Sequence, residues 1–163
     1  MANLRISTAL ACCSVLMLAG CGSSSSSRTS STGTTGTSAA GADATFFAQA
    51  NAVCRESQKI GSALPQPHNE AELAPFLERA LTLAQDEVSK VSALQPPADK
   101  AAAYRVWLSS LNQTLGELRA AVVAAKAHKT TEVDALVREG GGLSQRSLTR
   151  AAEVGLTACA KEG

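Results

Sequence analysis

The chain has few aromatic residues, few histidines and almost no net charge. Phenylalanine, tyrosine and tryptophan together make up 3% of its 163 residues, and only two histidines are present. The formal net charge of +1 provides no large basic surface for nucleic acid, and there is no acidic tail. These shortages argue against nucleic acid as a partner and against a histidine-rich metal centre.

The motifs of common catalytic sites are also missing. No Gly-x-Ser-x-Gly turn occurs, and the run Gly140-Gly141-Gly142 is not followed by the Lys and Ser or Thr of a phosphate loop. The carboxylates are scattered rather than paired for acid–base chemistry. His68 and His128 fall in expected loops, where solvated side chains are typical. We therefore expect a protein that is not an enzyme and that holds no metal and no cofactor.

The amino terminus has the parts of a secretory signal peptide. Arg5 supplies a positive charge, and residues 6–19 are nearly all apolar but too few to span a bilayer. The following Leu18-Ala19-Gly20-Cys21 resembles the lipobox of bacterial lipoprotein precursors. The resemblance implies that residues 1–20 are removed and that acyl chains such as palmitate on Cys21 hold the protein on a membrane, outside the cytoplasm. An ordinary signal peptide is the alternative.

Residues 21–42 are almost all Ser, Thr, Gly and Ala. A segment of this composition cannot bury enough apolar surface to offset the entropy of ordering it, so we expect a flexible linker. Its hydroxyl groups are candidates for O-glycosylation. Residues 43–163 are richer in Ala, Leu, Val and mixed charges, and they are enough for one domain with a single core.

Apolar residues in this domain recur every three or four positions, which predicts amphipathic helices at about 44–60, 70–94, 98–127 and 130–154. The clearest apolar stripe consists of Tyr104, Leu108, Leu111, Leu115, Leu118, Val122 and Ala125. No window reads as paired strands. The pattern therefore predicts an all-α, up-down-up-down four-helix bundle in which the first and fourth helices are neighbours.

Several residues predict where these helices begin, end or bend. Asn69 is a candidate N-cap for the second helix. Because proline is tolerated only in a first turn, Pro75 predicts that the regular helix begins nearer Ala74. The run Gly140–Gly142 predicts a kink, a break or a close contact with a neighbouring helix. Gly155 is a natural C-terminal cap for the fourth helix.

The five cysteines divide by position. Cys12 and Cys13 would leave with the signal peptide and Cys21 would take the lipid, so Cys54 and Cys159 remain. Outside the cytoplasm such a pair is expected to form a disulfide, worth roughly 4–5 kcal/mol in the chain-entropy model. Cys54 lies well inside the first helix, whose start would then overhang the fourth helix by ~15 Å. A reactive thiol pair and a soft metal site are the rival interpretations.

Three short motifs resemble a group of small secreted or lipid-anchored helical proteins, found mainly in high-GC Gram-positive bacteria. They are Ala50-Asn51-Ala52-Val53-Cys54-Arg55, Leu94-Gln95-Pro96-Pro97-Ala98, and the stretch from Gly155-Leu156 to Cys159. The similarity spans roughly residues 46–160. It implies a helical fold with a Cys54–Cys159 bridge, and it carries over no activity and no functional residue.

Two functions fit these observations. The first is a non-enzymatic module, anchored to the membrane, that binds a protein, a wall polymer or a lipid of the cell envelope. Tyr104 and Trp107 would then rim a groove between helices, where core packing is the plainer reading of both. The alternative is a carrier of a small apolar ligand or lipid between the helices. Small residues that would leave room for such a ligand are Ala50, Ala84, Ala125, Ala151 and the glycines.

Overall fold

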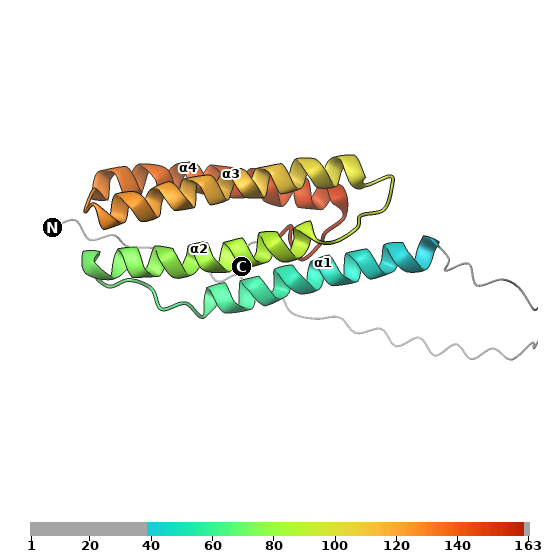
Figure 1. Cartoon of the computed structure of the whole chain (residues 1–163), viewed down its shortest axis with the longest axis horizontal. Coiled ribbons are helices and arrows are strands. Elements are labelled where there is room, and N and C mark those ends of the chain that lie inside the picture. The colour runs from blue at the N-terminus through green and yellow to red at the C-terminus, as the bar shows by residue number, and fades with distance from the viewer. Residues whose placement is uncertain (1–38, 162–163) are drawn as a thin grey trace, which may run out of the picture. The chain divides into compact units, whose positions relative to one another are not determined.

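The computed structural model describes residues 39–161, so the expected signal peptide, Cys21 and most of the expected linker lie outside the described part. Four helices make up most of this part: α1 (Ala39–Ser62), α2 (Glu70–Ser92), α3 (Ala101–Lys126) and α4 (Thr130–Val154). Successive helices run in opposite directions (Figure 1). No strand occurs between residues 39 and 161, which confirms the all-α, up-down-up-down prediction.

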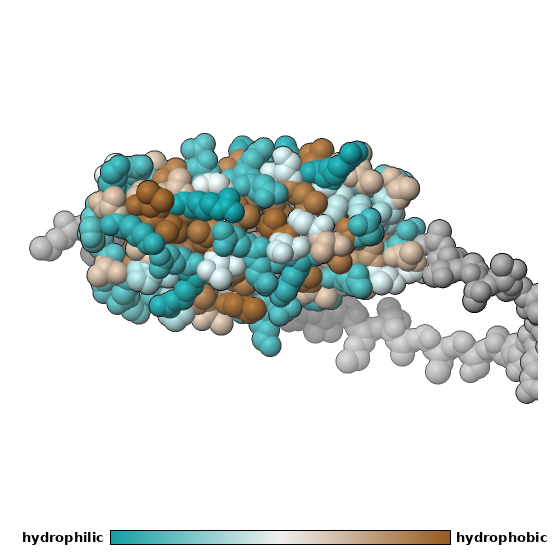
Figure 2. All heavy atoms as spheres, in the orientation of Figure 1, coloured by the Kyte–Doolittle hydropathy of each residue, from teal (hydrophilic) through white to brown (hydrophobic). Residues whose placement is uncertain are grey.

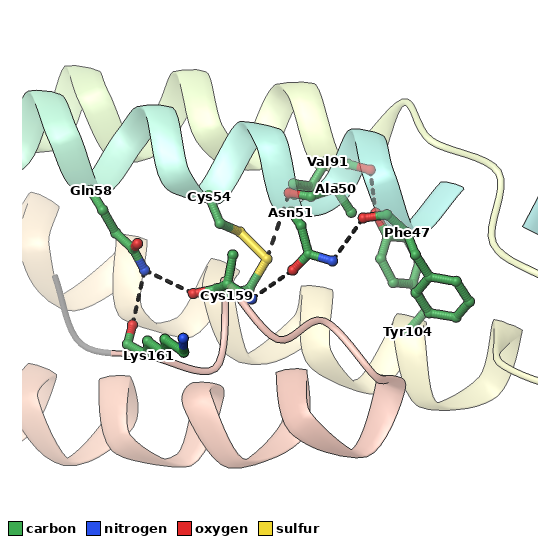
Figure 3. Close-up of a disulfide and its surroundings, with 10 residues drawn as sticks. Phe47, Ala50, Asn51, Cys54, Gln58, Val91, Tyr104, Cys159 and Lys161 are labelled. Carbon is green, nitrogen blue, oxygen red and sulfur yellow. Dashed lines mark hydrogen bonds between the residues drawn. A yellow bond between two sulfur atoms is a disulfide. The ribbon is translucent and has the colours of Figure 1, made fainter. Parts of the chain in front are cut away.

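The helices do not contact one another evenly. α3 and α4 form the most closely packed pair, α2 packs on α3, and α1 packs on α2. The first and fourth helices were predicted to be neighbours. In the structure, α1 and α4 do not pack directly on each other along their lengths. The segment after α4 turns back instead and runs between them (Figure 3). We call residues 156–161 the tail.

The start of α1 differs from the predicted one, whereas α2 begins directly after its predicted N-cap. α1 begins at Ala39 rather than near residue 44, because its first turns are rich in alanine, the strongest helix former. α2 begins at Glu70, and its N-cap Asn69 accepts a hydrogen bond from the Glu72 backbone N–H at 3.2 Å, as predicted. The Asn69 side-chain amide in turn donates to the Glu72 carboxylate at 2.9 Å. The cap at Asn69 was thus predicted from the sequence, whereas the helical conformation of the alanines before residue 44 was not.

The prediction that regular helix begins nearer Ala74 is wrong, because Pro75 lies inside α2. Proline lacks the N–H that would bond the carbonyl of Ala71, four residues earlier. Ala71 is exposed, so water can satisfy that carbonyl and the cost of the missing bond is reduced. The strong cap at Asn69 then holds the first turn in place.

The glycine run does not break α4, which is continuous from Thr130 to Val154. A Cβ built on Gly140 would lie 3.7 Å from the Cβ of Glu117, an ordinary contact with α3. Gly141 and Gly142 have open space where a Cβ would be. The predicted close approach to a neighbouring helix is therefore found at Gly140 alone, and the other two glycines are exposed.

Two buried clusters form the core, one toward each end of the bundle. The first surrounds the cysteine pair and joins α1, the ends of α2 and α4, the start of α3 and the tail. Its fully or nearly fully buried members include Phe46, Ala50, Cys54, Val91, Tyr104, Trp107, Ala151, Val154 and Leu156. The second cluster joins the other halves of α2, α3 and α4, without α1. It consists of Leu77, Ala121, Val122, Ala124, Ala125 and Val133.

The outside of the bundle is mostly polar. On the face shown in Figure 2, hydrophilic side chains separate small apolar areas along the helices. Within the described part, no helix combines the length and the apolarity needed to cross a bilayer.

The tail depends on the turn that ends α4. Gly155 has φ 98°, the left-handed conformation that costs an L-residue about 1–2 kcal/mol. Its N–H and that of Leu156 donate to the carbonyl of Ala151 at 3.1 and 2.9 Å. Leu156 is then fully buried in the first cluster. Gly155 thus turns the chain back onto the bundle, where Leu156 secures it.

We predict that Gly155→Ala lowers the free energy of unfolding by about 1–2 kcal/mol, because alanine is strained at this φ and because its Cβ would meet the Phe47 ring at 3.4 Å. Gly142→Ala is the matched control, since it adds the same methyl group to a helical position with open space. It should stabilise the fold by up to about 1 kcal/mol. Urea unfolding of both oxidised variants measures the difference, and equal stability of the two would contradict this view of the turn.

Candidate functional site: an interhelical pocket beside the disulfide

Cys54 on α1 and Cys159 in the tail form a disulfide across a sequence separation of 105 residues. Their Cα atoms are 5.1 Å apart, within the usual range for a bridge. Both residues are buried, at 1% and 7% exposure. The pair therefore joins the first helix to the last described segment in the middle of the first core cluster.

Side chains of α1 hold the tail on both sides of the bridge (Figure 3). The Asn51 side-chain oxygen accepts the N–H of Ala158 at 2.6 Å, while its amide group donates to the Phe47 carbonyl at 2.8 Å. The Gln58 amide group donates to the carbonyls of Ala158 at 2.9 Å and Lys161 at 3.0 Å. α1 thus satisfies part of the tail backbone, and turns within the tail satisfy the N–H groups of Ala160 and Lys161, which donate to the carbonyls of Leu156 and Ala158 at 3.0 and 3.3 Å.

The start of α1 overhangs the end of α4 as expected, and the direction of the tail explains how the disulfide still forms (Figure 1). After Gly155 the chain runs back along α1, so Cys159 reaches Cys54 well inside that helix (Figures 1 and 3). The N-terminal turns of α1 extend past the end of α4 in Figure 1. A disulfide at this position needs the left-handed turn at Gly155, since a helix continued past Val154 would carry Cys159 away from Cys54.

A pocket of about 470 Å³ lies between the four helices, beside the disulfide. Most of its wall is apolar, from Ala84 and Val88 on α2, Trp107, Leu111, Leu115 and Leu118 on α3, and Leu148 on α4. Trp107 also belongs to the first core cluster, and the other positions on α2, α3 and α4 fall between those of the two clusters. The pocket therefore lies in the middle of the bundle, where α1 and α4 are not packed together. Lys161, the last described residue of the tail, lines it.

Small residues explain why this middle section is not filled. Ala84 and Gly141 face the pocket, and Gly141 has no atom within 4 Å of the place its Cβ would take. The other small residues expected to leave a cavity, Ala50, Ala125 and Ala151, are packed into the two core clusters instead. The expectation of a cavity lined by small residues is thus met by Ala84 and Gly141.

Glu87 on α2 is the one acidic residue that lines the pocket. Burial raises the pKa of its carboxyl above the ordinary value, partly offset by a hydrogen bond from the Ser57 side chain. None of the described ion pairs includes Glu87. Lys90, on the same helix, pairs with Glu56 and Asp86 instead. A half-buried carboxylate without a cation nearby destabilises the fold, so its presence at the pocket calls for an explanation.

Glu87 was not predicted as a site residue, because in the sequence it is one of several scattered carboxylates. The signal was its spacing, because Ala84, Glu87 and Val91 share one face of α2 at intervals of three and four residues. A carboxylate in register with an apolar stripe points into a core or a pocket.

Of the two aromatic residues proposed to rim a groove, Trp107 alone lines the pocket, and it is 1% exposed. Tyr104 lies in the first core cluster, where its hydroxyl donates to the Val91 carbonyl. Burial raises the pKa of Tyr104 to about 12. Trp107 therefore forms part of a pocket wall, and Tyr104 joins α2 to α3.

The two histidines lie at separate loops. The backbone N–H of His68 donates to the Glu72 carboxylate at 2.9 Å, and His128 has a positive φ of 57° in the turn between α3 and α4. Between residues 39 and 161, no three His, Cys, Asp or Glu side chains come together as metal ligands would.

A second hollow lies on the outside of the molecule, between the end of α1 and the first half of α2. This open groove of about 530 Å³ has an apolar floor of Ile60, Leu64, Pro75 and Leu83. Charged residues, Glu78, Arg79 and Asp86, form its edges.

Comparisons with known proteins found no matching family model, no matching curated protein and no matching solved structure.

We predict that Glu87→Gln makes the protein more stable at neutral pH. Because the folded-state pKa of Glu87 is raised, the folded protein holds a proton that the unfolded chain has lost, and stability falls as pH rises through that interval. Glutamine keeps an acceptor for Ser57 and does not titrate. Melting temperatures of wild type and variant should nearly coincide near about pH 4 and diverge in favour of the variant above the raised pKa. A constant difference across the range would contradict the assignment.

Proposed function

We propose that this protein is a lipid-anchored domain on the outer side of a membrane, which binds a small and largely apolar ligand in the pocket between its helices. The pocket beside the disulfide is the observation that carries the binding role. The order of signal peptide, lipobox and linker in residues 1–42 is what carries the location.

The buried cystine supports a location outside the cytoplasm. Disulfides persist in oxidising compartments and are rare in the cytosol. Cys54 and Cys159 are both in the tightly packed first cluster, as befits a structural bridge rather than a reactive thiol pair. An anchor at Cys21 and the expected linker would hold such a domain close to the membrane.

The dimensions and lining of the pocket support a small-molecule ligand. Its volume of about 470 Å³ is within the roughly 300–1,000 Å³ common for ligand sites. Its apolar wall, with a few polar groups at defined positions, is also typical of such sites.

The same lining favours binding over catalysis. Among the described residues, Glu87 and Lys161 are the ionisable side chains of this lining, since Cys54 and Cys159 are bonded to each other. Lys161 is exposed at the end of the tail. A hydrolytic or transfer reaction ordinarily gathers a nucleophile, a base and an oxyanion donor at one place, and this lining does not supply that set.

The outer groove favours a second candidate function, binding of an envelope protein, a wall polymer or a lipid. Ile60 is 44% exposed at this groove, and apolar surface ringed by charge is typical of interaction sites. The groove is open to solvent, whereas the interhelical pocket is more enclosed, so we place the ligand in the pocket.

Native mass spectrometry of the protein extracted from its own membrane tests both parts of the proposal. We predict an acyl adduct on Cys21 and a co-purifying small molecule. Gly141→Leu should abolish the second signal, because the leucine side chain would occupy the pocket.

Gly142→Leu is the matched control, because Gly142 neighbours Gly141 in the same helix, has equally open space and does not line the pocket. It should retain the small molecule. A wild-type protein without any bound molecule, or equal retention by both variants, would count against the pocket, while an unmodified Cys21 would remove the anchor.

A further inference from the structure

Glu87 and Gln58 lie where the interhelical pocket meets another hollow, whereas the other uncharged polar side chains of the pocket, Thr114, Ser144, Gln145 and Ser147, lie on α3 and α4. A smaller hollow of about 310 Å³ lies between α1 and α2, and it shares Gln58, Ala84 and Glu87 with the interhelical pocket. The remaining lining of the smaller hollow is largely apolar and includes Leu64, Phe76 and Leu83. Glu87 and Gln58 thus form a polar position with apolar space on two sides.

Hydrogen-bond acceptors predominate at this position. Ser57 and Glu87 both line the smaller hollow, and the ionised Glu87 carboxylate has acceptor lone pairs and no donor. The Gln58 amide group donates to two carbonyls of the tail, and its oxygen faces away from the tail (Figure 3). No cation of the described residues pairs with Glu87. The site thus offers a carboxylate and an amide oxygen to a ligand that brings donors.

We propose that the ligand is a single-chain amphiphile whose primary amine binds between Glu87 and Gln58, with its apolar chain against the leucines of α3 and α4. This assignment rests on the proposed function. An ammonium group carries three donors and a positive charge, which would match both acceptors and neutralise the carboxylate. The pocket is the size used for one drug-sized molecule, so the ligand has one chain rather than two.

Lys161 presents the opposite charge to the same pocket, and it would favour an anionic head. Its side chain is exposed, where water and salt weaken its attraction for a ligand. Glu87 is half-buried, and a charge interacts more strongly in that less polar surrounding. The carboxylate, rather than the exposed ammonium of Lys161, therefore determines the head group.

The test is a titration of the mature chain from residue 21 onward, with Cys21→Ser so that its own acyl chains cannot compete. Trp107 is the only tryptophan and lines the pocket, so its fluorescence reports occupancy. The probes are decylamine, decanol and decanoate, which share a chain and differ in head group. We expect decylamine to bind at least about tenfold more tightly than decanol, and decanoate most weakly.

Variants separate the charge of Glu87 from its shape. Glu87→Gln should lower the affinity for decylamine about tenfold and leave decanol unchanged. Glu153→Gln is the control, because Glu153 is an exposed carboxylate on α4 that does not line the pocket, and it should leave decylamine binding unaltered. The affinity of a lysophosphatidylethanolamine with a decanoyl chain, compared with that of decylamine, shows whether the pocket binds the amine of a lipid head group or that of a free alkylamine.

The outcomes distinguish the two proposals. If none of the probes changes the Trp107 signal, the pocket is not a ligand site and the proposed function fails with this assignment. If all three bind alike, if decanoate binds best, or if Glu87→Gln leaves the decylamine affinity unchanged, the amine assignment alone is overturned. Retained helicity of Glu87→Gln by circular dichroism establishes that a loss of binding does not come from unfolding.

Discussion

The covalent link between α1 and the tail is the constraint on which the rest of the bundle depends. α3 and α4 pack closely and α2 rests on α3, whereas α1 has α2 as its principal helical neighbour. The bridge from Cys54 to Cys159, with Asn51 and Gln58 holding the tail backbone on either side, supplies the contact that a fourth helix would ordinarily make. In the chain-entropy model a loop of this length is worth roughly 4–5 kcal/mol.

The same arrangement accounts for the pocket. The described tail is thinner than a helix, and it fills the space between α1 and α4 near the first core cluster (Figure 3). Beyond that cluster Ala84 and Gly141 leave the interior open. Each glycine of α4 lowers the stability of the helix. A ligand bound beside Gly141 in the pocket would stabilise the folded state and offset this loss.

The helices were predictable because apolar residues recur at the helical period, and because Asn69 and Gly155 are recognisable caps of α2 and α4. The disulfide followed from two remaining cysteines. The sequence did not reveal the path of the tail, because a left-handed glycine predicts the end of a helix and not the direction of the chain beyond it.

The pocket was harder to predict than the helices. Small residues are equally consistent with close packing and with a cavity, so Ala50, Ala84 and Ala151 looked alike in sequence although only Ala84 faces the pocket. Glu87 was recognisable from its register within α2, but its lack of a cation depends on which charges the other helices bring near it. Such pairings are properties of the tertiary structure.

Hydrogen exchange of the oxidised and reduced protein tests the role of the bridge most directly. If the tail fastens α1 to the bundle, reduction should remove the protection of backbone amides around Ala50 to Cys54 and in the tail, while the amides of α3 and α4 stay protected. Unchanged protection of α1 after reduction would mean that the helix is held without the disulfide, and would contradict this account.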